Sequence, residues 1–89
     1  MRGEIELALA DIDRALAIDD KNPIAYKLQA EIFDESGQTD KAEASYRKVY
    51  ELTKKNPHAV PLNYLEKIDA KAAEKIRKAK EKETANEKS

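Results

Sequence analysis

The sequence predicts an all-α fold in which about four helices form antiparallel hairpins, stacked as a short α-solenoid. Three observations support it. First, the triplet Lys21-Asn22-Pro23 returns as Lys55-Asn56-Pro57, 34 residues later, and this period is typical of helix–turn–helix repeats. Second, apolar residues recur at every third or fourth position between the breaks. Third, the breaks carry residues that start or end helices, such as Asn22 and Gly37.

The first expected helix covers residues 4–18, and residues 19–23 stop it. One of its faces is apolar, with Ile5, Leu9, Ile12 and Leu16 in a stripe and Ala8 and Ala15 beside them. In the 34-residue register Gly3 aligns with Gly37, so residues 1–22 correspond to the second helix of an incomplete repeat. Such a helix is either cut from a longer array or completed by another chain. The alternative is an ordinary first helix with a chance match at Gly3.

A complete helical hairpin is expected over residues 23–56. Asn22 is a favourable N-cap, and Pro23 stands at the first helical position, where its missing N–H has no cost. Gly37 can take the left-handed conformation that ends a helix, and Thr39 can cap the next one. The apolar stripes of the two helices contain Tyr26, Ala30 and Phe33, and then Ala42, Tyr46 and Val49. The small side chains at Ala30 and Ala42 would let the two helices approach closely.

These residues resemble the tetratricopeptide repeat family, in which aromatic and small residues hold fixed positions of a 34-residue hairpin. The matching positions are Tyr26, Gln29, Ala30, Phe33, Gly37, Ala42, Tyr46 and Val49. Gln29 stands in place of the usual leucine, and Lys54 in place of a late proline. The resemblance covers residues 3–60. It implies a protein-binding module in which the first helices of successive units line a concave groove.

After Pro57 the repeat register decays. Because a residue before proline is biased out of the helical region, Val60 and Pro61 predict an irregular start over residues 57–60 and a long helix from near Pro61. An apolar stripe continues through this helix at Leu62, Leu65, Ile68, Ala72, Ile76 and Ala79. We interpret residues 57–83 as a single capping helix that closes the stack, and residues 84–89 as a frayed tail.

Composition limits the possible partners. The chain has 89 residues, enough for one domain, and a net charge of −1, so neither nucleic acid nor membrane is expected to bind it. No apolar run approaches the ~20 residues of a membrane span, and the start lacks a signal-peptide core. The absence of cysteine fits a cytoplasmic protein. The basic run over residues 75–82 is interleaved with glutamates, so we interpret it as a solvated helix rather than as a phosphate contact.

The sequence contains no pattern of catalytic, cofactor-binding or metal-binding residues. His58 is the one histidine, and no cysteine could share a metal ion with it. Ser36 and Ser45 have no base and acid arranged to activate them. The acidic pairs lie at helix ends on a solvated chain. We therefore expect no enzyme and no cofactor.

The first functional class is a module that binds a peptide or helix of another protein. The family resemblance implies a groove lined by Ile24, Lys27, Leu28, Glu31, Asp34 and Glu35, continued by His58, Leu62 and Leu65. The apolar positions with their acidic margin favour an amphipathic helix or a basic, apolar peptide. The alternative is that these apolar positions pack against the chain's own last helix.

The second functional class is self-association, in which a second copy completes the half repeat by swapping or by end-to-end stacking. The residues expected to take part are Ile5, Ala8, Ile12, Ala15 and Leu16. A further interpretation is an excised or engineered fragment whose own activity is only folding.

Overall fold

The computed structural model describes residues 2–88, with side chains described for residues 3–81. This part of the chain contains five α-helices, one 3-10 turn and no strand, which confirms the all-α class and corrects the expected number of about four helices. The elements are α1 (Arg2–Ile18), α2 (Pro23–Glu35), α3 (Thr39–Leu52), η1 (Pro57–Ala59), α4 (Leu62–Ile68) and α5 (Ala70–Lys88). The backbone of residues 84–88, expected to be a frayed tail, is helical as the end of α5, and Ser89 lies outside the described residues.

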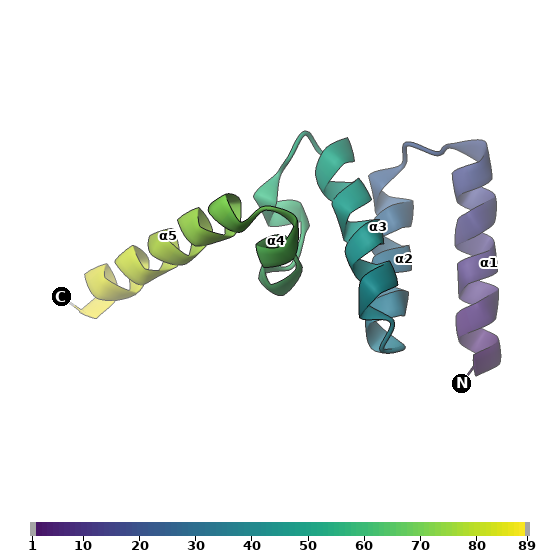
Figure 1. Ribbon diagram of the computed structural model, residues 1–89, viewed down its shortest axis with the longest axis horizontal. Coiled ribbons are helices and arrows are strands. Elements are labelled where there is room, and N and C mark those ends of the chain that lie inside the picture. Colours follow the sequence, from purple (N-terminus) through teal and green to yellow (C-terminus); the bar gives the residue numbers. More distant parts are fainter. Residues whose placement is uncertain (1, 89) are drawn as a thin grey trace.

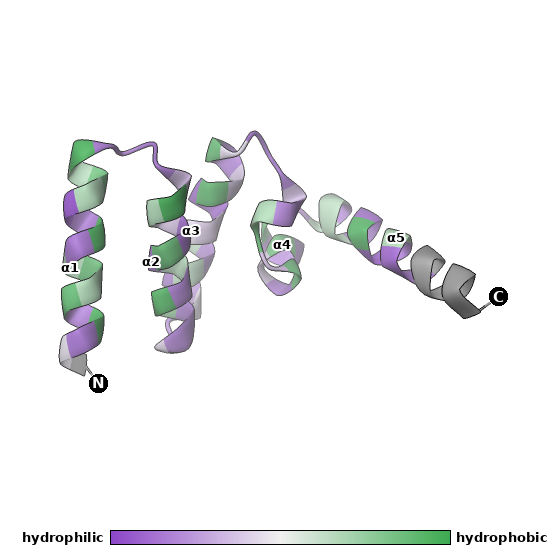
Figure 2. Cartoon of the chain, turned by 180° about the vertical axis from the view of Figure 1, so that it is seen from behind, coloured by the Kyte–Doolittle hydropathy of each residue, from purple (hydrophilic) through white to green (hydrophobic). Residues whose placement is uncertain are grey.

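The first three helices lie side by side and alternate in direction, and α5 leads away from α4 at the opposite end of the molecule (Figure 1). The most extensive packing joins α2 to α3, while α1 packs against α2, and α4 packs against α3. Each of these helices mixes hydrophobic and hydrophilic residues along its length, as amphipathic helices do (Figure 2). The molecule is elongated, measuring 50 × 29 × 20 Å.

The start of α2 is the predicted one. The Asn22 side chain accepts a hydrogen bond of 3.0 Å from the backbone N–H of Ile24, and Pro23 opens the helix. The same arrangement recurs one repeat later, where the Asn56 side chain accepts from the N–H of His58 at 3.0 Å. The two Lys-Asn-Pro triplets therefore perform one structural task twice: they satisfy an N–H group that the first turn leaves without a partner.

The turn between α2 and α3 agrees with the prediction at Gly37 and differs at Thr39. Gly37 has a φ of +79°, the left-handed conformation expected at the end of a helix. The N-cap of α3 is Gln38, whose carbonyl accepts from the N–H of Ala42 at 3.0 Å, and Thr39 is the first residue of the helix. The capping role expected for Thr39 is wrong because the helix begins one residue earlier than that role requires.

The main core lies where α2, α3, α4 and the first turns of α5 meet. Its buried residues are Ala30, Ala42, Tyr46, Val49, Tyr50, Val60, Tyr64, Leu65 and Ala73. Ala30 and Ala42 are fully buried, as expected for small residues between closely approaching helices. The Tyr46 and Tyr64 rings stack with centroids 4.8 Å apart and planes tilted by 40°. Beyond this cluster, Ile12 of α1 and Ala25 of α2 are also buried.

The single long helix expected from near Pro61 is wrong, because the chain bends at Asp69. This residue has φ −149° and ψ 88°, outside the helical region, and it separates α4 from α5. One oxygen of its carboxylate accepts from the backbone N–H of Ala72 at 3.2 Å, so Asp69 caps the first turn of α5. The irregular start expected over residues 57–60 is confirmed as the 3-10 turn η1 and the extended Val60.

Candidate functional site

The outward face of α2 carries two exposed apolar side chains one helical turn apart. Ile24 is 67% exposed and Leu28 is 48% exposed, and both belong to the predicted groove. Single exposed hydrophobic residues are ordinary on protein surfaces, but two on one face of a helix form a small patch. Because both side chains are exposed, neither packs against the chain's own last helix, as the alternative interpretation would require.

Charged residues flank this patch. Lys27 lies beside Ile24 and Leu28, and Glu31 follows at the next turn of the same face because residues three and four apart are neighbours on a helix. Lys27 and Glu35 are exposed, and Glu31 is half-buried. Asp34 accepts a hydrogen bond of 2.5 Å from the Tyr64 hydroxyl, which ties the end of α2 to α4. The predicted acidic margin is therefore present, with Asp34 also serving the fold.

The predicted groove does not continue over the C-terminal segment as expected. Leu65 is fully buried in the core, so it cannot contact a partner, and its assignment to the groove is wrong. Leu62 and His58 line a different hollow, next to α5. Leu65 is part of the core, and Leu62 is half-buried against it.

The residues expected to mediate self-association are mostly occupied within the chain. Ile12 is buried, while Ile5, Ala8 and Leu16 are half-buried on a helix that packs against α2. Ala15 alone among the five is exposed. The large exposed hydrophobic residues of α1 are Leu7 (69%) and Ile18 (89%), which sequence reasoning did not single out. Their position on the helical wheel, opposite Ile12, is the signal that could have identified them.

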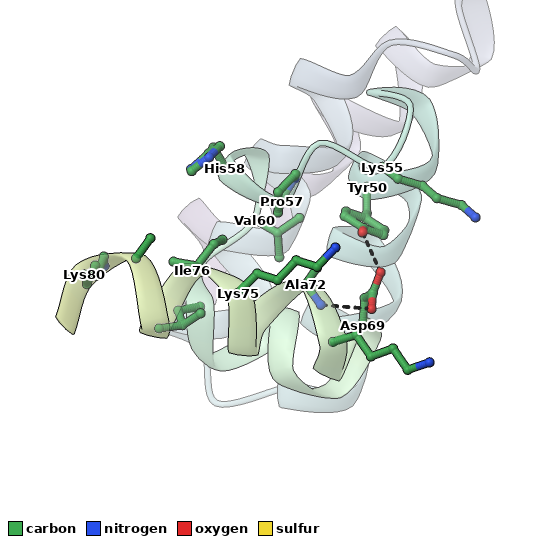
Figure 3. Close-up of a pocket in the computed structure, with 13 residues that line it drawn as sticks. Tyr50, Lys55, Pro57, His58, Val60, Asp69, Ala72, Lys75, Ile76 and Lys80 are labelled. Atoms are coloured by element: carbon green, nitrogen blue, oxygen red, sulfur yellow. Dashed lines mark hydrogen bonds between the residues drawn. The ribbon is translucent and has the colours of Figure 1, made fainter. Parts of the chain in front are cut away.

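A hollow of about 940 Å³ lies between η1, α4, α5 and the end of α3 (Figure 3). Sequence reasoning missed it because it exists only where α5 turns away from α4 at Asp69. Apolar lining comes from Pro57, Val60, Leu62, Ala72, Ile76 and Ala79. Polar and charged lining comes from Tyr50, Lys55, His58, Asp69, Lys71, Lys75 and Lys80.

A hydrogen bond closes one end of this hollow. The Tyr50 hydroxyl donates to the Asp69 carboxylate at 2.7 Å, joining the end of α3 to the start of α5 (Figure 3). This bond, assisted by the N–H of Ala72, lowers the pKa of Asp69 below its usual value. The same hydrogen bond, together with burial, raises the pKa of Tyr50. At the other inter-helix contact, donation to Asp34 raises the pKa of Tyr64 to about 12.

We expect Tyr50→Phe to raise the pKa of Asp69 toward the ordinary aspartate value, because the bond that stabilises the carboxylate is lost. A lowered folded pKa stabilises the fold above the ordinary pKa of 3.8, and this stabilisation disappears as pH falls through the lowered pKa. The loss of stability on acidification below about pH 4 should therefore be smaller in the variant. NMR titration of the Asp69 carboxyl carbon checks the pKa directly, and equal values in the two proteins would contradict the assignment.

No family model, curated protein or solved structure matches the chain. Within the described part of the chain, no helix combines the length and the apolar composition needed to cross a bilayer. Among the described side chains, no group of three or more potential ligands is placed to hold a metal ion. In the described part of the chain, three surfaces are candidates for function: the outward face of α2, the outer face of α1 and the hollow beside α5.

Proposed function

We propose that this chain is a protein-interaction module of the tetratricopeptide type, which docks a helix or peptide of a partner protein on the outward face of α2. The observation that carries this proposal is the exposure of Ile24 and Leu28 on that face. Both side chains remain in solvent although the hairpin of α2 and α3 buries a contiguous core beside them. Stability of this hairpin does not require apolar residues at either position, so a binding role is the better explanation.

The repeat architecture supports the same proposal. The 34-residue recurrence of Lys-Asn-Pro places helix starts at Pro23 and Pro57, and both starts are capped by the preceding asparagine. Ala30 and Ala42 lie fully buried between α2 and α3, as the small residues of such hairpins do. In a short α-solenoid of this kind, α2 would be the first helix of its unit, with its outward face free to bind.

The apolar and charged residues of this face indicate which kind of partner it would bind. An apolar pair one turn apart accepts the apolar stripe of an amphipathic helix or the side chains of an extended peptide. Glu31 and Glu35 add negative charge beside the pair, against one positive charge from Lys27. A partner segment that presents apolar anchors with lysine or arginine next to them would therefore be favoured.

The double substitution Ile24→Asp/Leu28→Asp is expected to abolish partner capture and to leave the fold intact, because both side chains are exposed. Pull-down with the purified chain, followed by mass spectrometry, measures capture, and circular dichroism checks helicity. Ala44→Asp is the matched control, since Ala44 is exposed on α3, away from the proposed face. Partner capture that survives the double substitution would overturn the proposal, as would an equal loss in the control.

Self-association through α1 is a second candidate, favoured by the exposure of Leu7 and Ile18. It predicts a molar mass above 10.1 kDa that rises with protein concentration in light scattering. Leu7→Asp/Ile18→Asp should then restore the monomer. A constant monomer mass over a tenfold concentration range would eliminate this candidate.

A further inference from the structure

We infer that the hollow beside α5 is a second docking site, which takes an acidic amphipathic helix of a partner protein. The inference does not rest on the α2 proposal, because the residues of the two surfaces are different. It rests on three features of the hollow: its apolar floor, its basic rim, and the excess of lysines over the single acidic residue of the lining.

The floor of the hollow is an apolar stripe that runs along α5. Ala72, Ile76 and Ala79 follow each other at i, i+4 and i+7 along α5, so they form one stripe. Pro57, Val60 and Leu62 continue the apolar lining on the other wall. A groove with two apolar walls can bind an amphipathic helix, which packs its apolar stripe between them.

The rim is basic because of a specific set of lysines. Lys71 and Lys75 each precede a floor residue by one position, so they flank the apolar stripe of α5. Among the described side chains, neither forms an ion pair, whereas Arg77 pairs with Glu66, and Lys78 pairs with Glu74. Lys71 and Lys75 are thus available to an anionic partner, while Arg77 and Lys78 of the same helix are already paired.

Lys55 adds to this rim from the end of α3. It lines the hollow with a φ of 60°, a backbone conformation that residues other than glycine and asparagine rarely adopt, and Lys54 before it has a φ of 58°. The turn that ends α3 accounts for this conformation, because the N–H of Lys55 donates to the carbonyl of Tyr50 at 2.8 Å. His58 lies at the opposite wall, on η1.

The one acidic residue of the lining, Asp69, remains an anion and offsets one positive charge, because Lys55 acts electrostatically on its carboxylate. Asp69 accepts from the Tyr50 hydroxyl at 2.7 Å through one oxygen, and from the N–H of Ala72 at 3.2 Å through the other. Both oxygens are engaged in holding α5 against α3. The local excess of positive charge therefore favours carboxylates beside an apolar stripe on the partner.

A protein helix fits these features better than a nucleic acid. Single-stranded nucleic acid stacks its bases on exposed aromatic rings, but in this lining Tyr50 is buried, which leaves the His58 imidazole as the one exposed ring. A phosphate backbone would use the lysines and leave the apolar floor without a partner. An acidic amphipathic helix uses both. It also has the charge opposite to that of the partner favoured by α2, so one chain can distinguish two ligands by charge.

The test uses three synthetic helical peptides and fluorescence anisotropy with the full chain. The first peptide has a leucine stripe flanked by glutamates, the second has glutamine in place of each glutamate, and the third has the acidic composition scrambled so that no stripe forms. We expect the first to bind on the order of tenfold more tightly than either of the others, and its affinity to fall with added salt.

Substitutions on the rim and the floor locate the site. Lys71→Glu/Lys75→Glu should weaken binding of the acidic peptide by at least about tenfold. The same variant should bind more tightly a peptide that has lysine in place of each glutamate. Both lysines are exposed, so the fold should tolerate the change. Ala79→Asp, at an exposed position of the floor, should also weaken binding of the acidic peptide. Lys21→Glu/Lys48→Glu is the control, because it makes the same change in net charge at exposed positions away from the hollow.

Four results would overturn the inference. Equal binding of the scrambled peptide would show attraction to surface charge alone, and an equal loss in the control would show the same. Equal competition by a single-stranded oligonucleotide of matched charge would indicate a general anion surface. A concentration-dependent molar mass of the chain alone, abolished by Lys71→Glu/Lys75→Glu, would assign the hollow to the acidic α1 of a second copy.

Discussion

Replacing Leu65 with alanine is expected to lower the free energy of unfolding by about 3 kcal/mol. Leu65 is the largest side chain that the fold buries completely, and it lies where α4 meets the core. Its loss removes apolar contacts and leaves a cavity that surrounding helices cannot fully close. A chain of 89 residues has a total stability of roughly 4–13 kcal/mol, so this one substitution should be a large part of it.

Denaturant unfolding followed by circular dichroism measures this change. Leu7→Ala is the matched control, because Leu7 is 69% exposed and should change the free energy of unfolding by less than about 0.5 kcal/mol. A loss below about 1 kcal/mol in Leu65→Ala would mean that α4 is not packed as described.

The second large effect is expected at the contact between α2 and α3. Ala42→Leu should destabilise the fold by about 1–3 kcal/mol, because Ala42 is fully buried, as is Ala30 of α2, and a larger side chain has no room there. Ala44→Leu, two residues further along the same helix, is exposed and should be nearly neutral. Thermal unfolding compares the two variants, and equal melting temperatures would contradict the close approach of the helices.

Features set by short-range chemistry could be predicted from the sequence. The cap at Asn22 and the left-handed Gly37 depend on a few neighbouring atoms, so residue type and position were sufficient to place them. The spacing of apolar residues predicted the helices for a similar reason. Tyr46 and Ala42 fall on the buried side of α3 because a 3.6-residue period fixes which side chains share a face.

The bend at Asp69 could not be predicted from periodicity. The apolar stripe steps by three or four residues across the bend as well as within each helix, so it reads as one continuous helix. The competing signal was Asp69 itself, a strong N-cap residue, which also accepts a hydrogen bond from Tyr50 nineteen positions earlier, a contact that the local sequence does not reveal. Because the hollow beside α5 is formed by this bend, the sequence alone gave no indication of it.

Of the residues predicted to line the groove, Ile24 and Leu28 are exposed on α2, whereas Leu65 is buried by tertiary packing. Ile24 and Leu28 are exposed because α1 and α3 occupy the other sides of α2. Leu65 was expected on the same surface, but α4 turns it into the core. Periodicity identifies which residues share a face of one helix, whereas the neighbours of that helix determine whether the face meets solvent or the core.

The two candidate surfaces of the chain have opposite charge preferences. The α2 face is apolar with an acidic margin, and the hollow beside α5 is apolar with a basic rim. A protein with this arrangement can bring together two partners of different charge without attracting either over its whole surface.

The central claim is that the outward face of α2 docks another protein, and site-specific photo-cross-linking tests it most directly. A photoreactive amino acid placed at Leu28 should yield a cross-linked partner protein in cells, identified by mass spectrometry. The same amino acid at Ala44, exposed on α3, should yield none. Partner cross-links of equal yield from both positions, or their absence at Leu28, would contradict the claim.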